Sequence, residues 1–415
     1  MDADPATPRA GSGTDGSVSQ MSLPTIDHLD VAGRVVLLRT DLNVPLEDGR
    51  ITDDFRIVAA LPTIQELRRR GARVVVASHL GRPSGADPSL SMAPVAETLA
   101  TLGGFPVAVA DDVAGDSALT HSRSGGPIGV GADPVVVLEN TRFEPGETKN
   151  DSALAERLAV LADCFVMDAF GSAHRAHAST VGVAGHLPSA AGPLMLAEVE
   201  AFERLIHHPT PPFVVVLGGA KVSSKIGAIE RLVERVDRLL VGGAMCFTLL
   251  AARGEPTGAG MIEEGMVDRV RGLLDAHGDR IVLPADLVVG ESFAADTPHR
   301  VARVTDLEPS DLGLDIGPET TAEFAAAIGG AATLFWNGPL GVAEWEAFAG
   351  GSRGVADAIA AVDAYSVVGG GDTVAFLRSM GREHTVSHLS TGGGAGLELI
   401  EHGSLPGIDA LRGKS

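Results

Sequence analysis

Short hydrophobic runs alternate with amphipathic stretches along most of the chain. Runs rich in β-branched residues, typical of buried strands, occur at residues 35–38, 74–76, 135–138 and 214–217. Segment 226–236 instead carries apolar residues three and four positions apart, a spacing that predicts an amphipathic helix. Because this order of strand and helix is repeated over hundreds of residues, we expect an α/β fold with two doubly wound, Rossmann-like parallel sheets.

The residues that follow the predicted strands differ between the two halves of the chain. In the N-terminal half they are polar and often cationic, as in Arg39-Thr-Asp41-Leu-Asn43, Ser78-His79-Leu-Gly-Arg82, Glu139-Asn140-Thr-Arg142 and His174-Arg175-Ala-His177. In the C-terminal half they are glycines, as in Leu217-Gly-Gly-Ala-Lys221, Val241-Gly-Gly-Ala, Trp336-Asn-Gly-Pro, Val368-Gly-Gly-Gly-Asp372-Thr373 and Ser390-Thr-Gly-Gly-Gly394. One half therefore offers cationic side chains to an anion, and the other offers backbone N–H groups at helix starts.

This contrast predicts two anion sites, because open parallel sheets bind ligands beyond the carboxyl ends of their strands. A small anion suits the arginine and histidine residues, and nucleotide phosphates suit the glycines, so the layout indicates phosphoryl transfer. Two other patterns carry little weight. Gly11-Ser-Gly-Thr-Asp-Gly16 has the dinucleotide spacing but follows no predicted strand. His174 and His177 have no Glu or Cys partner at a zinc-ligand spacing.

The predicted domain organisation follows from the same pattern. Residues 194–207 are expected to form a helix that leads into His208-Pro-Thr-Pro-Pro212. We predict a disordered extension over 1–21, an N-terminal domain over 22–193, a hinge helix over 194–210 and a nucleotide-binding domain over 211–395. Residues 396–415 are expected to return to the N-terminal domain.

Composition narrows the class of protein. The chain has 415 residues and a formal net charge of −22, which disfavours a nucleic-acid partner because phosphate backbones require a basic surface. No apolar run approaches the roughly 18 residues of a membrane span, and the first residues lack the hydrophobic core of a secretory signal. The two cysteines, Cys164 and Cys246, lie among apolar residues and predict buried thiols in a reducing cytoplasm.

The motifs together resemble the phosphoglycerate kinase family over roughly residues 22 to 412. The resemblance is carried by Arg39-Thr-Asp-Leu-Asn-Val-Pro45, Ser78-His-Leu-Gly-Arg-Pro83, Asp168-Ala-Phe-Gly, His174-Arg-Ala-His-Ala-Ser179, Gly218-Gly-Ala-Lys-Val222, Trp336-Asn-Gly-Pro339, Gly369-Gly-Gly-Asp-Thr373 and Ser390-Thr-Gly-Gly-Gly-Ala395. Met167, Pro193, Ala343 and Gly396 depart from the residues usual in the family. None of these departures removes a charged group.

The resemblance implies the site residues. The three-carbon substrate would be held by Asp41, Leu42, Asn43, Arg56, His79, Leu80, Gly81, Arg82, Arg142 and Arg175. The nucleotide would be bound by Gly219, Lys221, Lys225, Gly242, Gly243, Gly313, Leu314, Asn337, Pro339, Glu344, Gly370, Gly371, Asp372 and Thr373. Arg39, Lys221, Arg175, Gly371 and Gly394 would serve catalysis, and Asp372 would hold Mg²⁺ through the nucleotide.

The expected reaction is reversible transfer of the acyl phosphate of 1,3-bisphosphoglycerate to ADP by a cytoplasmic monomer. In reverse the nucleophile is a carboxylate with a pKa of about 3.5, so no general base is needed. Positioning, charge neutralisation and closure of a hinge between the domains remain as the protein's tasks. A non-catalytic nucleotide-binding scaffold is the main alternative, and the retained Lys221, Arg175 and Asp372 argue against it. A nicotinamide dehydrogenase is a weaker alternative, because no dinucleotide glycine pattern follows a strand.

Overall fold

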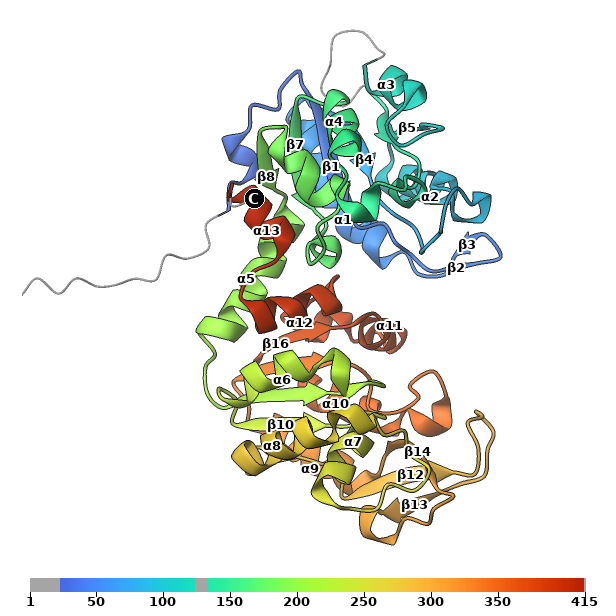
Figure 1. Ribbon diagram of the computed structural model, residues 1–415, viewed down its shortest axis with the longest axis vertical. Coiled ribbons are helices and arrows are strands. Elements are labelled where there is room, and N and C mark those ends of the chain that lie inside the picture. The colour runs from blue at the N-terminus through green and yellow to red at the C-terminus, as the bar shows by residue number, and fades with distance from the viewer. Residues whose placement is uncertain (1–22, 124–132, 414–415) are drawn as a thin grey trace, which may run out of the picture.

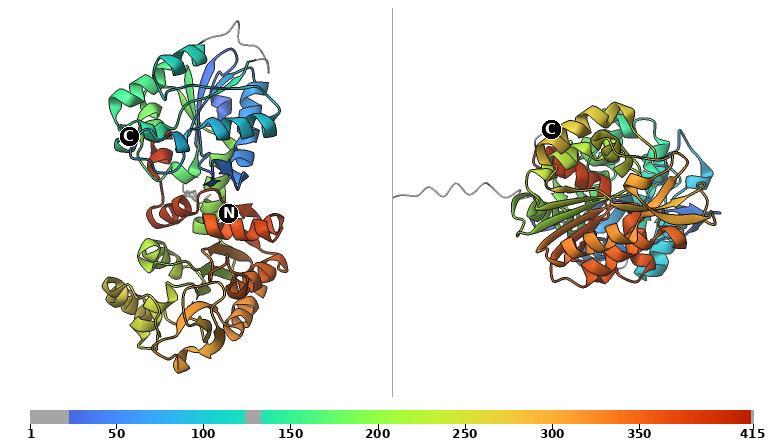
Figure 2. Two further views of the ribbon diagram at one scale, coloured as in Figure 1. Left: turned by 90° about the vertical axis from the view of Figure 1, so that its right-hand side faces the viewer. Right: turned by 90° about the horizontal axis from the view of Figure 1, so that it is seen from below.

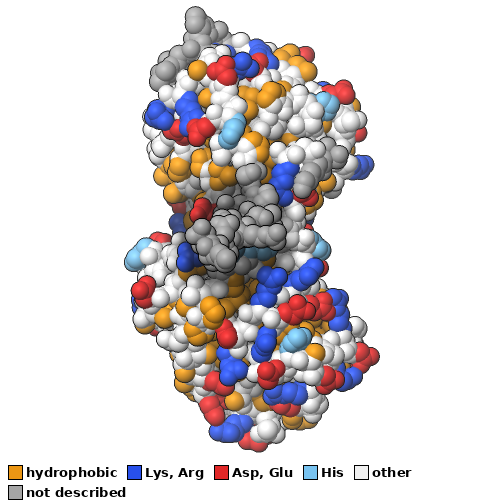
Figure 3. Space-filling view, turned by 90° about the vertical axis from the view of Figure 1, so that its left-hand side faces the viewer, with side chains coloured by type: hydrophobic (Ala, Val, Ile, Leu, Met, Phe, Trp, Pro, Cys, Tyr) orange, Lys and Arg blue, Asp and Glu red, His pale blue; other side chains and the backbone are white. Residues whose placement is uncertain are grey.

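The chain forms two lobes arranged one above the other along the long axis of the molecule (Figures 1 and 2). A computed structural model describes residues 23–123 and 133–413. The predicted disordered extension, residues 1–21, lies outside the described residues. The face seen in Figure 3 narrows between the lobes, and acidic and basic side chains are interspersed over both of them. Within the described ranges, none of the helices combines the length and apolar character that crossing a bilayer requires.

The first lobe is built on a six-stranded parallel sheet with the order β5-β6-β4-β1-β7-β8. Its strands are β1 (Val35–Thr40), β4 (Arg73–Ala77), β5 (Val107–Val109), β6 (Val135–Val137), β7 (Cys164–Asp168) and β8 (Ser189–Ala191). A short antiparallel pair, β2 (Leu46–Glu47) and β3 (Arg50–Ile51), lies beside it. The central strands β1 and β4 are buried along their whole length, as their continuous runs of apolar residues predict.

The second lobe repeats this architecture with a parallel sheet of order β11-β10-β9-β15-β16-β17. Its strands are β9 (Phe213–Leu217), β10 (Arg238–Val241), β11 (Ile281–Val282), β15 (Thr333–Asn337), β16 (Tyr365–Gly369) and β17 (His388–Leu389). The α/β fold with two parallel sheets is therefore confirmed. An additional antiparallel sheet was not predicted; it comprises β12 (Asp286–Gly290), β13 (His299–Arg303) and β14 (Leu312–Ile316).

Helices cover both faces of each sheet. In the first lobe, α1 (Phe55–Arg69) and α2 (Ala93–Gly103) pack in one hydrophobic cluster, whereas α3 (Asp116–Arg123) and α4 (Ser152–Val160) pack in another. The alternating side chains of β1 separate these clusters, since Val36 points into one and Leu37 into the other. In the second lobe the helices are α6 (Ile226–Val233), α7 (Cys246–Arg253), α8 (Val267–His277), α9 (Pro318–Gly329), α10 (Gly350–Ala360) and α11 (Gly371–Ser379).

Three helices connect the lobes. The predicted helix at 194–207 is α5 (Pro193–His207). At the waist it lies beside α12 (Gly393–His402), and the last helix, α13 (Pro406–Leu411), packs on the first lobe. The backbone of α13 is attached to the first lobe, where Gly407 N donates to Ala173 O at 2.9 Å.

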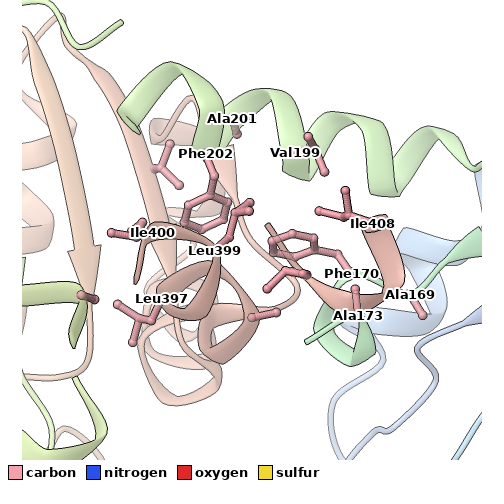
Figure 4. Packing of buried hydrophobic residues seen from close by; sticks show 14 of the residues in the cluster. Ala169, Phe170, Ala173, Val199, Ala201, Phe202, Leu397, Leu399, Ile400 and Ile408 are labelled. Atoms are coloured by element: carbon pink, nitrogen blue, oxygen red, sulfur yellow. The ribbon is translucent and has the colours of Figure 1, made fainter. Parts of the chain in front are cut away.

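A continuous apolar core runs through the waist (Figure 4). The ring of Phe170 stacks on that of Phe202 at 5.6 Å between centroids, and Phe202 meets Phe335 edge to face at 5.9 Å. Phe202 comes from α5, and a Cβ on Gly396 would lie 2.1 Å from its ring. This close approach leaves no room for a side chain at position 396.

Candidate active site

Arg39 lies near the end of β1 and is fully buried. Its Nε donates to Ser179 Oγ at 2.9 Å, and its Nη2 lies 3.1 Å from His79 Nδ1. Burial lowers the pKa of Arg39, and the negative charges of Glu147 and Asp41 act in the opposite direction. The guanidinium is therefore fixed in place by the first lobe without being exposed.

Asp41 follows β1 and forms an ion pair with Arg56, the second residue of α1. Arg56 Nη1 lies 3.0 Å from Asp41 Oδ1 and 3.1 Å from the carbonyl oxygen of Asn43. Although burial opposes ionisation, the positive charge of Arg56 lowers the pKa of Asp41. Asp41 therefore orients an arginine.

Backbone groups line the same edge of the sheet. Asn43 Oδ1 accepts a hydrogen bond from Gly81 N at 2.8 Å, and Ser78 Oγ accepts one from Leu42 N at 2.8 Å. Leu42 and Leu80 are buried. These two leucines therefore support the loops that carry the polar groups.

Four arginines converge beyond the strands. Arg142 Nη1 donates to the carbonyl oxygen of Gly81. Burial, followed by the charges of Arg175, Arg39 and Arg82, lowers the pKa of Arg142. Arg142 Nε is buried and has no hydrogen-bond partner among the described residues. A buried donor without a partner, surrounded by like charges, indicates a place for an anion.

The remaining cationic residues differ in exposure. Arg82 and Arg175 are exposed, so they can reach a ligand from the rim. His79 is buried, and this burial holds its pKa well below the usual value despite the opposing charge of Asp41. His79 therefore contributes a neutral hydrogen-bonding group and not a positive charge.

On the second lobe, bare backbone takes the place of side chains. Gly219 N donates to Pro339 O at 2.9 Å, and a Cβ on Gly218 would lie 2.0 Å from that same oxygen. Gly243 has a φ of +63°, and a Cβ there would lie 2.5 Å from Gly219 N. At Gly242 a Cβ would meet a neighbouring leucine side chain at 2.7 Å. These glycines allow three strand ends to approach one another closely.

The two lysines of the loop after β9 occupy different environments. Lys225 Nζ donates to both the carbonyl oxygen and Oδ1 of Asn337. Burial lowers the pKa of Lys225 to about 8, opposed by the charge of Asp372. Lys221 is exposed. Lys225 is therefore held within the site, whereas the ammonium of Lys221 extends into solvent.

A cavity of about 460 Å³ opens between these glycines and the additional antiparallel sheet. Its walls include the predicted nucleotide residues Gly219, Gly243, Gly313, Leu314, Pro339, Glu344 and Asp372. The predicted residues Gly242, Lys221, Lys225, Asn337, Gly370, Gly371 and Thr373 are not among its walls.

Sequence reasoning missed the apolar walls of this cavity. Phe247 and Met261 line it, together with Phe293, whose ring lies 4.7 Å from that of Trp345. Asp315 is also a wall residue; it accepts a hydrogen bond from Gly351 N at 2.8 Å, and burial raises its pKa to about 7. Phe293 and Met261, with 68% and 45% of their surfaces accessible, differ from ordinary core residues. That difference is not visible in the sequence.

The start of α11 lies at the boundary between the two lobes. Asp372 is exposed in its first turn, and Gly371 beside it is also exposed. Thr373 is fully buried, and its hydroxyl accepts a hydrogen bond from Gly338 N at 2.8 Å. Gly370 precedes the helix with a φ of +98°. Asp372 is therefore the group in this turn with the freest access to a ligand.

The two edges meet across a second cavity of about 250 Å³. Asn43 and Arg56 line it from the first lobe, and Asp372 and Thr391 from the second. Arg56 Nη2 approaches the carbonyl oxygen of Thr391 at 3.4 Å. Gly394, in the first turn of α12, is exposed, and a Cβ added there would meet no atom within 4 Å.

An ion pair also bridges the lobes. Arg378 of α11 contacts Asp53 and Asp54, which immediately precede α1, the Nη2 to Asp54 Oδ1 distance being 3.2 Å. Its guanidinium also lies 5.2 Å from the ring centroid of Phe55. The helix that begins at Gly371 is thus connected to the helix that carries Arg56.

Comparison with known proteins gives a consistent result. The family described as phosphoglycerate kinase matches residues 26–403. The chain is 52% identical over 402 residues to a phosphoglycerate kinase of Salinispora arenicola, covering 94% of this chain and all of that protein. It is 53% identical over 397 residues to one of Frankia alni, covering 93% and 99% of the two chains.

Solved structures agree. The structure of phosphoglycerate kinase from Coxiella burnetii superimposes with a TM-score of 0.80 at 40% identity, covering 95% of this chain and 100% of that one. The enzyme from Pyrococcus horikoshii gives a TM-score of 0.83 at 30% identity, with the same coverage.

Proposed function

The chain belongs to the phosphoglycerate kinase family, and we propose that its cationic and glycine-rich strand ends form the two halves of one active site. The enzyme transfers the acyl phosphate of 1,3-bisphosphoglycerate reversibly to ADP, giving 3-phosphoglycerate and ATP in glycolysis and gluconeogenesis. The assignment of residues rests on one observation above all. Arg142 is surrounded by other arginines and keeps a buried donor unpaired.

The first lobe would bind the three-carbon substrate. Arg82, Arg142 and Arg175 supply guanidinium groups suited to bidentate contact with phosphate and carboxylate oxygens. Arg56, oriented by Asp41, reaches toward the cleft between the lobes. The neighbouring loops that contain Asn43 and Gly81 complete the binding surface.

The second lobe would bind ADP or ATP. The apolar cavity of about 460 Å³ suits the adenosine, with Glu344 available for the ribose hydroxyls. Lys221, Lys225 and the first turn of α11 would face the phosphates. Adenosine in the apolar cavity would leave its phosphates directed toward the cleft.

Asp372 fits a magnesium ion carried by the nucleotide. It is an exposed carboxylate that lines both cavities, and Mg²⁺ is usually held by one or two carboxylates together with substrate phosphates. When bound, Mg²⁺ would neutralise charge on the phosphate oxygens.

The phosphoryl transfer depends on the positions of the two reacting groups and needs no proton transfer. In the direction of ATP synthesis, an oxygen of the ADP β-phosphate attacks the acyl phosphate, and the bond to the carboxyl oxygen breaks. The leaving carboxylate, with a pKa of about 3.5, needs no proton at neutral pH. Arg39 and Lys221 would stabilise the negative charge on the oxygens of the phosphoryl group in transit.

Closure of the two lobes would bring donor and acceptor into line and exclude water. The helices α5 and α12, which lie at the waist, are the expected hinge elements. We further propose that the enzyme acts as a cytoplasmic monomer that binds neither nucleic acid nor membranes.

Substitution of Lys221 tests the assignment. In a coupled assay with ADP and 1,3-bisphosphoglycerate, Lys221→Ala should lower kcat by about 10² or more, the effect of losing one transition-state charge partner. The Kd for ADP should change far less. Lys149→Ala, which removes an exposed lysine of the first lobe, is the matched control and should be neutral. A normal kcat with a raised KM for ADP would assign Lys221 to ground-state binding instead.

A further inference from the structure

Behind Arg39 lies a buried carboxylate that the mechanism above does not use. Glu147 begins the short 3-10 helix η4 (Glu147–Lys149) and is fully buried. Ser179, in the single helical turn η6 (Ala178–Gly182), lies between Glu147 and Arg39 and is also buried. Neither residue was singled out by the sequence as a member of the site.

The hydrogen bonds in this chain have a defined direction. Ser179 Oγ accepts from Arg39 Nε at 2.9 Å and donates to Glu147 Oε1 at 2.6 Å. Glu147 Oε2 accepts from Ser179 N at 3.0 Å. An ionised carboxylate can only accept hydrogen bonds, so the serine hydroxyl proton must point toward Glu147. A lone pair of the hydroxyl is thereby left for Arg39 Nε.

The charges in the network agree with this reading. Although burial opposes its ionisation, the nearby imidazole of His177, the charge of Arg39 and a hydrogen bond with Ser179 lower the pKa of Glu147. His177 Nδ1 lies 3.7 Å from Glu147 Oε1. Glu147 is thus a stable anion behind a buried cation.

Arg39 needs such an anchor because other cations lie nearby. Its charge acts on Arg142, and its Nη2 lies close to His79 and 3.4 Å from Ser172 Oγ. Without a fixed contact at Nε, repulsion from Arg142 would favour other rotamers of the long side chain. The bond from Nε to Ser179, together with the bond from Nη1 to the carbonyl oxygen of Thr40, fixes the plane of the guanidinium.

We propose that Glu147 is a positioning residue for catalysis that acts through Ser179 to fix the guanidinium of Arg39. The inference rests on the proposed function, because it assumes that Arg39 stabilises the transferred phosphoryl group. Glu147 itself touches neither substrate. Its loss should therefore lower kcat and leave substrate affinities nearly unchanged.

The test is a double-mutant cycle measured in kcat. Glu147→Gln should lower kcat by about tenfold or more, since small misplacement of a catalytic group has effects of up to about 10². The KM values for ADP and 1,3-bisphosphoglycerate should change by less than about threefold. Introduced into an Arg39→Ala background, Glu147→Gln should cause no further loss, because the residue through which it acts is gone.

Two further variants keep the test decisive. Ser179→Ala removes only the bridging hydroxyl and should reproduce the loss in kcat, even where Glu147→Gln lowers the melting temperature. Glu144→Gln is the matched control: its carboxylate pairs with Arg157 at 2.6 Å on the exterior, and its loss should leave kcat unchanged.

The outcomes separate the two hypotheses. A kcat that falls equally in the wild-type and Arg39→Ala backgrounds would show a general structural role and overturn the inference. Normal kcat in both Glu147→Gln and Ser179→Ala, with Arg39→Ala impaired, would overturn it as well. An unimpaired Arg39→Ala enzyme would instead remove the catalytic role of Arg39, on which the proposed function depends.

Discussion

The two strand edges of this enzyme, which we propose bind anions, are built by opposite means. The edge of the first lobe uses side chains, with Arg39, Arg56 and Arg142 each held by hydrogen bonds from their own lobe. The edge of the second lobe is formed by backbone groups. Side chains are excluded there, because Gly218 and Gly243 lie where a Cβ would overlap backbone atoms. One edge should therefore be sensitive to removal of atoms, and the other to their addition.

Substitutions at the two edges should also differ in how they affect ligand affinity and the free energy of unfolding. Arginines at the rim are poorly neutralised without a ligand, so removing one should cost affinity more than folding free energy. The glycines are part of the backbone packing between strand ends, so a substitution there should cost both. The predictions below test this contrast, beginning with the largest expected effect.

Gly243→Ala should disrupt the glycine-rich edge. The left-handed backbone costs about 1–2 kcal/mol for a residue with a Cβ, and overlap with Gly219 N adds about 1–3 kcal/mol. Denaturant unfolding should show this loss, and ADP binding should weaken, whereas 3-phosphoglycerate binding should not. Gly272→Ala in α8, where a Cβ meets nothing within 4 Å, is the control. Equal stability of the two variants would refute the close approach at Gly243.

Arg142→Ala should weaken 3-phosphoglycerate binding by about 1.5–3 kcal/mol, the range for hydrogen bonds to charged groups. Its melting temperature should hardly change, because removing one of several converging cations also relieves repulsion. Calorimetric titration should give an unchanged affinity for ADP. If ADP binding were lost and the acid retained, the assignment of ligands to lobes would be reversed.

Closure of the lobes should require both ligands. Each ligand alone contacts one edge and shifts the equilibrium modestly, whereas both together span the cleft. Small-angle scattering should therefore show a clear fall in the radius of gyration only in the ternary complex. Arg378→Ala should make that fall slightly smaller, since a partly exposed ion pair contributes about 0.2–1 kcal/mol. Arg382→Ala, whose partner Asp357 lies in the same lobe, should not. A constant radius in all samples would rule out closure.

When ADP binds near pH 8, the protein should take up a fraction of a proton from solution. With a pKa of about 8, Lys225 is roughly half protonated there, and phosphate anions raise its pKa by favouring the charged form. The affinity for ADP should consequently fall as the pH rises above 8. Calorimetry in buffers with different ionisation enthalpies measures the uptake, which Lys225→Gln should abolish. Release of protons on binding would contradict the sign of this linkage.

Much of the fold could be predicted from local patterns. The strands at 35–38 and 214–217 and the helix at 194–207 correspond to β1, β9 and α5. Such elements can be predicted because each leaves a local pattern in the sequence. A buried parallel strand requires a continuous apolar run, and an amphipathic helix requires apolar residues three and four positions apart. The antiparallel strands β12–β14 were missed; β13 is largely exposed, and its sequence His299-Arg-Val-Ala-Arg303 contains no continuous apolar run.

The sequence by itself determined which residues follow the strands, and with them the division into a cationic edge and a glycine edge. It also carried the motifs that indicate the family. Only the tertiary structure decided that Glu147 lies behind Arg39 and that Phe293 borders the cavity of the second lobe. It also joined Phe170, Phe202 and Phe335 into one core through the waist. Pairing of a buried charge and packing of rings depend on residues brought together from far apart in the chain, and no local period records such contacts.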